Sequence, residues 1–274
     1  MPRRRFAVIA MLFVAFSLNA QISKQALTQP TPQTKQQLTK ALQEYREKKD
    51  RHGEALTLLQ LGVTEAGLGN ISGARSNLGE AVEKMRAQND AVGAWLALNV
   101  LVQLELALKR PADAIPHIKK AFTVINEAKV STAPFSLKTF VAMGSLSGFS
   151  AQMSPMPDES NAAMFKPILL QYLLEPMTHD QYGSVLTEIG ELEKAEAELK
   201  AAAAGFAFSQ GMYDFSIEAH FGDLRFRQQR YGDARTHYMK ALNASSKTAS
   251  MLPMGGDQLV KAGIYDRLER LETI

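Results

Sequence analysis

A sparse skeleton of leucine, glycine and alanine recurs along the chain at multiples of roughly 40 residues, a spacing typical of repeat proteins. It is clearest in segment 55–81, ALTLLQLGVTEAGLGNISGARSNLGEA. Leucines and a glycine spaced by three and four residues mark one helix face, and the following glycines end the helix because glycine adopts left-handed backbone angles at little cost. Ser72 is the expected N-cap of a second helix with its own apolar stripe. The segment predicts a helix–turn–helix hairpin with the skeleton Leu58, Leu61, Gly62, Gly69, Ala74, Leu78 and Ala81.

The same skeleton reappears when the sequence is compared with itself. A shift by one repeat unit carries Leu58, Leu61, Ala74, Leu78 and Ala81 onto Leu98, Leu101, Ala114, Ile118 and Ala121. A shift by three units and one further position carries Gly62, Gly69, Leu78 and Ala81 onto Gly183, Gly190, Leu199 and Ala202. A shift by four units carries Gly62, Ala74, Leu78 and Ala81 onto Gly222, Ala234, Tyr238 and Ala241. This recurrence predicts stacked hairpins that bury their apolar faces against one another.

The leucine–glycine pair, the mid-turn glycine and the alanines of the second helix resemble the tetratricopeptide repeat (TPR), in a long variant of about 40 residues. That unit length also lies in the range of HEAT-type helical pairs. The chain departs from the TPR pattern at Glu65 and Glu105, where an aromatic residue is usual, and at Val102, which replaces the glycine. The resemblance implies an all-α fold over residues 35–274, a right-handed α-solenoid of about five hairpins with N- and C-terminal capping helices.

The expected hairpins differ in regularity. They cover residues 51–89, 90–129, 131–177, 178–210 and 212–246, between capping helices at 35–49 and from Asp257 onward. The third is irregular, because a helix at 135–149 is followed by the loop SAQMSPMPDESN at about 150–161 and a second helix at 162–175. Met153 and Met156 in this loop either offer adaptable contacts to a partner or fill gaps in the packing.

The N-terminus predicts export. Arginines at positions 3–5 precede an uncharged apolar run from Phe6 to Leu18, which is short for a membrane span and typical of a secretory signal peptide at 1–20. Cleavage is expected after Ala20, and the alternative is an uncleaved anchor. The polar residues 21–34, with Pro30 and Pro32, predict a flexible linker. We therefore expect a periplasmic or secreted protein.

The charge of the mature chain argues against nucleic acid as a partner. The whole sequence has 31 lysines and arginines against 28 acidic residues, but 28 of each remain without the three arginines of the signal peptide. Binding to nucleic acid needs clustered surplus cations, which the sequence does not show.

The sequence predicts no catalytic chemistry, cofactor or metal. Cysteine is absent, and the five histidines are spread over four of the expected hairpins without a partner at metal-ligand spacing. Glu65 and Glu105 occupy equivalent positions in successive units; paired carboxylates can perform acid–base catalysis, but repeat symmetry explains the coincidence more simply.

In TPR-like solenoids, the first helices line a concave groove that holds a peptide or a partner helix. By this resemblance, the groove positions are Leu56, Leu59, Val63, Ala66, Leu96, Asn99, Gln103, Leu106, Ala219, Asp223, Phe226 and Arg227. Their apolar character favours an amphipathic helix or an extended apolar segment as ligand. The alternative is that Leu56 and Leu59 pack within the seam between helices.

Two functions follow from this interpretation. The first is a non-catalytic protein–protein interaction scaffold of the bacterial periplasm or cell exterior. The second is a regulatory or substrate-recruiting subunit of a separate enzyme. The sequence leaves the identity of the partner and the oligomeric state open.

Export is directly testable. We expect N-terminal sequencing of protein from the periplasmic fraction to begin at Gln21, because the apolar run is too short to remain as a span. Recovery of chains with intact Met1 in the membrane pellet would contradict cleavage.

Overall fold

The computed structural model describes residues 31–140, 160–206, 214–247 and 256–274. These ranges are helical apart from turns and short connections, and they contain no strand, which confirms the expected all-α class. The chain forms two compact units. The first comprises Met1–Arg110 and Lys119–Pro167, and the second comprises Pro111–Ile118 and Ile168–Ile274.

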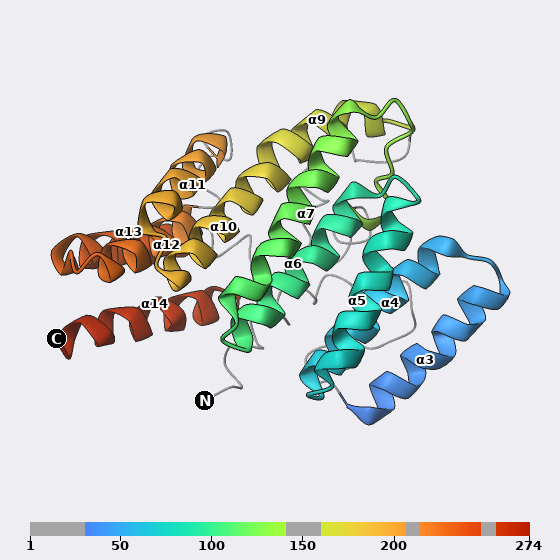
Figure 1. Cartoon of the computed structure of the whole chain (residues 1–274), viewed down its shortest axis with the longest axis horizontal. Coiled ribbons are helices and arrows are strands. Elements are labelled where there is room, and N and C mark those ends of the chain that lie inside the picture. Colours follow the sequence, from blue (N-terminus) through green and yellow to red (C-terminus); the bar gives the residue numbers. More distant parts are fainter. Residues whose placement is uncertain (1–30, 141–159, 207–213, 248–255) are drawn as a thin grey trace. The chain divides into compact units, whose positions relative to one another are not determined.

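In the first unit, helices that are neighbours in sequence pack side by side. α3 packs on α4, α4 on α5, and α5 on α6 (Figure 1). A long helix, α7, follows, and its residues from Lys119 onward belong to this unit. The bounds are α3 Pro32–Glu47, α4 Arg51–Gly67, α5 Ile71–Arg86, α6 Ala91–Ala107 and α7 Pro111–Val130.

The turns between these helices share one backbone geometry, which recurs at a constant interval, once per helix. A residue with positive φ lies shortly after the end of each helix, at Lys49, Gly69, Asn89 and Lys109. The next residue caps the following helix at Asp50, Asn70 and Asp90, whose side chains accept the N–H of the glycine three positions on at 2.9, 3.2 and 2.8 Å. Side-chain capping satisfies N–H groups that have no partner within the helix.

The two helices of a hairpin approach closely where one of them has a glycine. A Cβ added to Gly62 of α4 would lie 2.5 Å from Cγ of Leu78 in α5. A Cβ on Gly183 would lie 2.6 Å from Cγ of Leu199, and one on Gly222 would meet the ring of Tyr238. The interval in sequence between the glycine and its large partner is the same in all three cases, so the hairpins share one register.

The second unit begins within a long helical stretch. α9 Ala162–Leu169, the π-helical turn η3 Leu170–Leu174 and α10 Glu175–Ile189 follow one another without an intervening turn. α10 pairs with α11 Leu192–Gly205, and α12 Asp214–Arg227 pairs with α13 Tyr231–Lys247. α12 also contacts α10 and α11, and α14 Gly256–Glu272 packs on α13.

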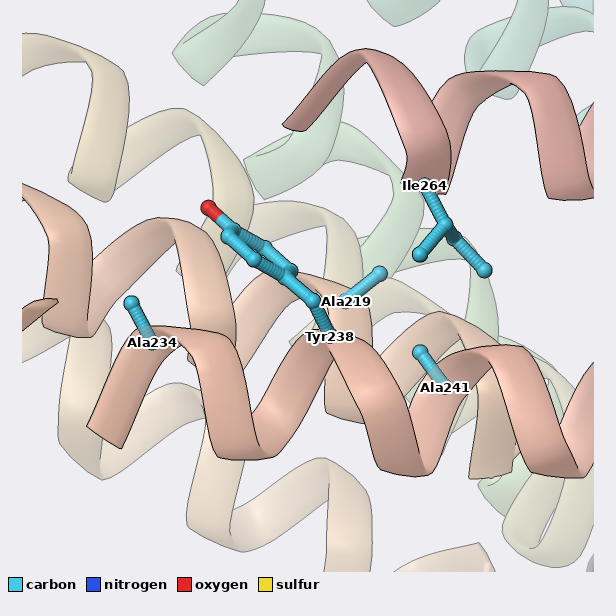
Figure 2. Close-up of a cluster of buried hydrophobic side chains, with 5 residues drawn as sticks. All are labelled: Ala219, Ala234, Tyr238, Ala241 and Ile264. Carbon is cyan, nitrogen blue, oxygen red and sulfur yellow. The ribbon is translucent and has the colours of Figure 1, made fainter. Parts of the chain in front are cut away.

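The core of the last hairpin gathers small residues around one aromatic ring. Ala234, Tyr238 and Ala241 project from α13, Ala219 from α12 and Ile264 from α14 (Figure 2). All five are buried. Alanine at successive turns lets the helices approach closely, and Tyr238 fills the space left over Gly222.

The expected helix break between Glu175 and Thr178 is wrong. The chain remains helical there, and Pro176 lies in the first turn of α10. Proline has no N–H and crowds the carbonyl four residues earlier. The wider π turn accommodates this change in hydrogen bonding, with the N–H of Glu175 bonded to the carbonyl of Leu170.

Other boundaries differ by a few residues. α3 begins at Pro32 rather than 35, and Asn70 replaces Ser72 as the cap of α5. Of the helix expected at 135–149, residues 138–140 are helical, residues 135–137 are not, and residues 141–149 lie outside the described residues. The signal peptide and most of the linker and of the loop 150–161 also lie outside them. A right-handed solenoid of about five hairpins stays a prediction.

The contact between Gly62 and Leu78 sets the spacing of the first hairpin, so we expect Gly62→Ala to destabilise it. The added methyl group overpacks the contact and should lower the free energy of unfolding by about 1–3 kcal/mol. Gly79→Ala is the matched control, because nothing lies within 4 Å of a Cβ there. It should raise the free energy of unfolding by roughly 0.5–1 kcal/mol. Urea denaturation of the two variants would refute the contact if both were equally stable.

Candidate functional site

The predicted groove positions of the first unit lie on helices that are enclosed on nearly all sides. Every residue from Ala55 to Ala66 of α4 is buried. Leu59 is 0% exposed and Val63 is 9% exposed. Ala66 packs with Ala74 of α5 and Leu104 of α6, as a residue of the seam does. The burial of these positions fits the alternative in which they contribute to packing.

α6 carries the remaining positions of that unit, and they are not equivalent. Leu96 and Asn99 are buried, whereas Gln103 and Leu106 are partly exposed. Oδ1 of Asn99 has no hydrogen-bond donor among the described residues. The C-terminal half of α6 is therefore the part of the predicted groove that solvent reaches, and Asn99 adds an unsatisfied acceptor one turn earlier.

The groove positions of the last hairpin lie against α14. Ala219 packs in the cluster that includes Ile264 (Figure 2). The guanidinium of Arg270 lies over the ring of Phe226, and its central carbon is 4.6 Å from the ring centroid. Arg227 is exposed and pairs with Glu188 of α10 at 3.1 Å.

Asp223 is the most constrained of these side chains. It accepts hydrogen bonds from Nε and Nη2 of Arg267, both at 2.8 Å, and from the hydroxyl of Tyr238 at 2.9 Å. Burial alone would raise the pKa of Asp223, but the charge and hydrogen bonds of Arg267 hold it below its ordinary value. Burial also raises the pKa of Tyr238, which stays a neutral donor. This carboxylate anchors α14 to the last hairpin.

The two glutamates at equivalent positions each have a cation from an earlier helix. Lys35 of α3 lies 2.9 Å from Glu65. Arg75 of α5 donates from Nε and Nη2 to the two oxygens of Glu105 at 2.8 and 2.6 Å. In both pairs the cation precedes the carboxylate by 30 residues. The two carboxylates are thus neutralised separately, as structural ion pairs are.

A third pair has the opposite polarity. In the second unit, Glu196 of α11 precedes its partner Arg225 of α12 by 29 residues, and the two atoms are 2.9 Å apart. The hydrogen bonds of Arg225, with those of Lys200, lower the pKa of Glu196 to about 2. Ion pairs separated by 29 or 30 residues therefore join one helix to the first helix of the next hairpin in both units.

Three histidines bind carboxylates through Nδ1, a pairing that the sequence did not indicate. His179 contacts Glu198, His220 contacts Asp180, and His237 contacts Glu218, each at 2.6 Å. Asp180 also accepts the hydroxyl of Ser216 at 2.7 Å. The serine bonds to the aspartate and not to the histidine, so the cluster does not form a catalytic triad. No group of three or more potential metal ligands occurs in the described ranges.

A small pocket of about 170 Å³ lies in the first unit, away from the predicted groove positions. Arg86, Glu127 and Lys166 line it together with apolar side chains. Arg86 is held by Glu127 at 2.8 Å, and Lys166 donates to the carbonyl of Ser131 at 2.6 Å. The three charged side chains that line the pocket therefore each bind another group of the chain.

Comparison with family models, with curated proteins and with solved structures finds no match. Among the described helices, none combines the length and the apolar character that crossing a bilayer requires.

The pair of Arg75 and Glu105 tests the role of these ion pairs. The carboxylate is 1% exposed, against 39% for the guanidinium. Arg75→Met should lower the free energy of unfolding by roughly 1–3 kcal/mol at neutral pH, because it leaves a buried carboxylate without its partner.

The exchanged pair, Arg75→Glu with Glu105→Arg, is the control, because it adopts the polarity that Glu196 and Arg225 already have. We expect it to recover most of the lost stability in urea denaturation. An exchanged pair that is no more stable than Arg75→Met would contradict the electrostatic explanation.

Proposed function

We propose that this protein is a non-catalytic scaffold that binds a protein or peptide along the first helices of its hairpins. The ligand is an amphipathic helix or an extended apolar segment. The proposal takes the hairpins to stack as a right-handed TPR-like solenoid of about five units, exported to the bacterial periplasm or the cell exterior.

The uncharged surface that α6 offers to solvent at Gln103 and Leu106 is the observation that carries this proposal. A buried acceptor without a donor costs about 1–3 kcal/mol. Asn99 lies on the predicted groove face of α6, one turn before Gln103. Its amide oxygen is buried and has no donor among the described residues, so a ligand reaches α6 at the partly exposed Gln103 and Leu106 that follow.

The composition of α6 supports an apolar ligand. The helix carries no charged side chain before Glu105, and that carboxylate is bound by Arg75. The half-buried Gln103 and Leu106 extend this uncharged surface toward solvent. Uncharged surface at the exposed end of a helix that is otherwise buried favours contact with another protein segment.

The double variant Gln103→Lys with Leu106→Lys tests the proposal. Both side chains reach solvent, so lysines there should leave helicity unchanged by circular dichroism while the captured partner is lost. Capture would be measured by pulldown from envelope extract and mass spectrometry. Val130→Lys is the control, because it adds charge at an apolar side chain that is 82% exposed on α7. It should leave capture intact.

Leu59→Lys should, unlike the double variant, unfold part of the protein. This side chain is fully buried, so a charge there should cost several kcal/mol and reduce the helical signal. If the double variant keeps both helicity and its partner, the ligand does not bind on α6. The segment around Met153 and Met156, outside the described residues, then becomes the next candidate. An enzyme among the captured partners would favour the role of a regulatory or substrate-recruiting subunit.

A further inference from the structure

The contact between α10 and α12 contains a partly buried cluster of charged groups around Asp180 and His220. Asp180 of α10 is 9% exposed, and both of its oxygens are occupied. Oδ1 accepts from Nδ1 of His220, and Oδ2 accepts from the hydroxyl of Ser216. Because the carboxylate can only accept, Nδ1 carries the proton. Asp223 and Arg267 lie beside this pair and act on the charge of His220.

The cluster is electrically balanced in one protonation state only. Asp180 and Asp223 contribute two negative charges, and Arg267 contributes one positive charge. Protonated His220 supplies the fourth charge and brings the sum to zero. With a neutral imidazole, one negative charge remains uncompensated in a largely buried site, which is costly.

The environment of the imidazole favours its protonated form. Burial by itself would lower the pKa of His220, but the charge and hydrogen bond of Asp180 outweigh it and hold the pKa above its ordinary value. A histidine whose pKa is raised by folding contributes stability that is complete below the unfolded pKa. That contribution is lost as pH rises through the folded pKa.

The charged groups that face His220 come from three helices. Asp180 belongs to α10, Asp223 to α12 itself and Arg267 to α14. From α13, Tyr238 acts through its hydrogen bond to Asp223. Ala202 of α11 and Phe206 after it are apolar and pack with Ile217 and Phe221 of α12.

The remaining ionisable groups at these contacts have partners other than His220, and one further ion pair, Arg227 of α12 with Glu188 of α10 at 3.1 Å, also joins the two helices. Glu196 of α11 binds Arg225, which is five residues and about 140° further round the helix from His220. Glu218 of α12 binds His237 of α13. The Asp180–His220 pair is thus the contact through which one titration acts on the joint between α10 and α12.

We propose that this contact is a proton-dependent joint: protonated His220 holds the α10–α11 hairpin to the α12–α13 hairpin, and its deprotonation weakens the joint while each hairpin stays folded. The hairpins are held internally by the contacts of Gly183 with Leu199 and of Gly222 with Tyr238. Neither contact depends on the ionisation of His220. Rising pH therefore changes how the two hairpins pack and leaves each of them intact.

His179 provides a matched control on α10, the helix that also carries Asp180. Its Nδ1 contacts Glu198 of α11 at 2.6 Å, the same distance as in the pair of His220 with Asp180. It joins the two helices of one hairpin, however, and Glu198 is 24% exposed. His179→Gln therefore removes an equivalent pair without touching the joint, whereas His220→Gln removes the joint's own titrating group.

The experiment is hydrogen exchange of the full chain between about pH 6 and 9, corrected for the intrinsic rate at each pH. In the wild type and in His179→Gln, we expect amides of α10 and α12 to open more readily as pH rises. The opening equilibrium should increase about tenfold for each unit by which the folded pKa exceeds the unfolded one. In His220→Gln, the corrected protection should not depend on pH.

Asp180→Asn keeps the proposal testable if His220→Gln fails to fold. It removes one negative charge, so the cluster is balanced with a neutral imidazole and the pH dependence should vanish. Proton NMR of the histidine rings, assigned with His220→Gln, should show the pKa of His220 lower in Asp180→Asn than in the wild type. The proposal is overturned if the variants at Asp180 and His220 keep the wild-type pH dependence. Loss of that dependence in His179→Gln, or uniform loss of protection within both hairpins, would also overturn it.

Discussion

Close approach of two helices at a glycine is the constraint on which the rest of each hairpin depends. Helix axes pack roughly 8–10 Å apart, and the distance is set by the side chains at the contact. At Gly62, Gly183 and Gly222, the absence of Cβ lets a large side chain of the second helix lie directly on the backbone of the first. Once that contact fixes the axial register, the turn geometry and the offset of the ion pairs follow, because each helix has a set length and start.

The recurring skeleton of the sequence marks the residues that make these contacts. Gly62 and Leu78 stand out by their recurrence, and they meet in the structure. The caps also have a signature in the sequence, since the Asp or Asn at positions 50, 70 and 90 is followed three residues later by Gly. Their interval is half that of the hairpins. A comparison at the hairpin period therefore aligns Asp50 with Asp90 and misses Asn70. The continuous helix through Pro176 was not predictable from periodicity, because backbone hydrogen bonding in one wider turn decides it.

The polar contacts were beyond prediction for a different reason. Glu65 and Glu105 are equivalent in the sequence pattern, but their cations lie 30 residues away on another helix. The third pair reverses its polarity, with the glutamate on the earlier helix, so a search for recurring residue types misses it. What recurs is the position and the opposite sign of the two charges. The two positions need charges of opposite sign, but either position can carry the cation. The requirement therefore acts on how hairpins stack and leaves the residue type at each position open.

Burial limits where a ligand can bind on the predicted groove. An apolar position with helical spacing has the same sequence signature in a groove and in a seam, so Leu59 and Leu96 could not be assigned from the pattern alone. Their burial, and the contacts of Asp223 and Phe226 with α14, leave few groove positions free to meet a partner. In the last hairpin, a ligand would have to displace Arg267 from Asp223 and would expose a buried carboxylate. At the C-terminal half of α6, it displaces only solvent, so binding there carries the lower cost.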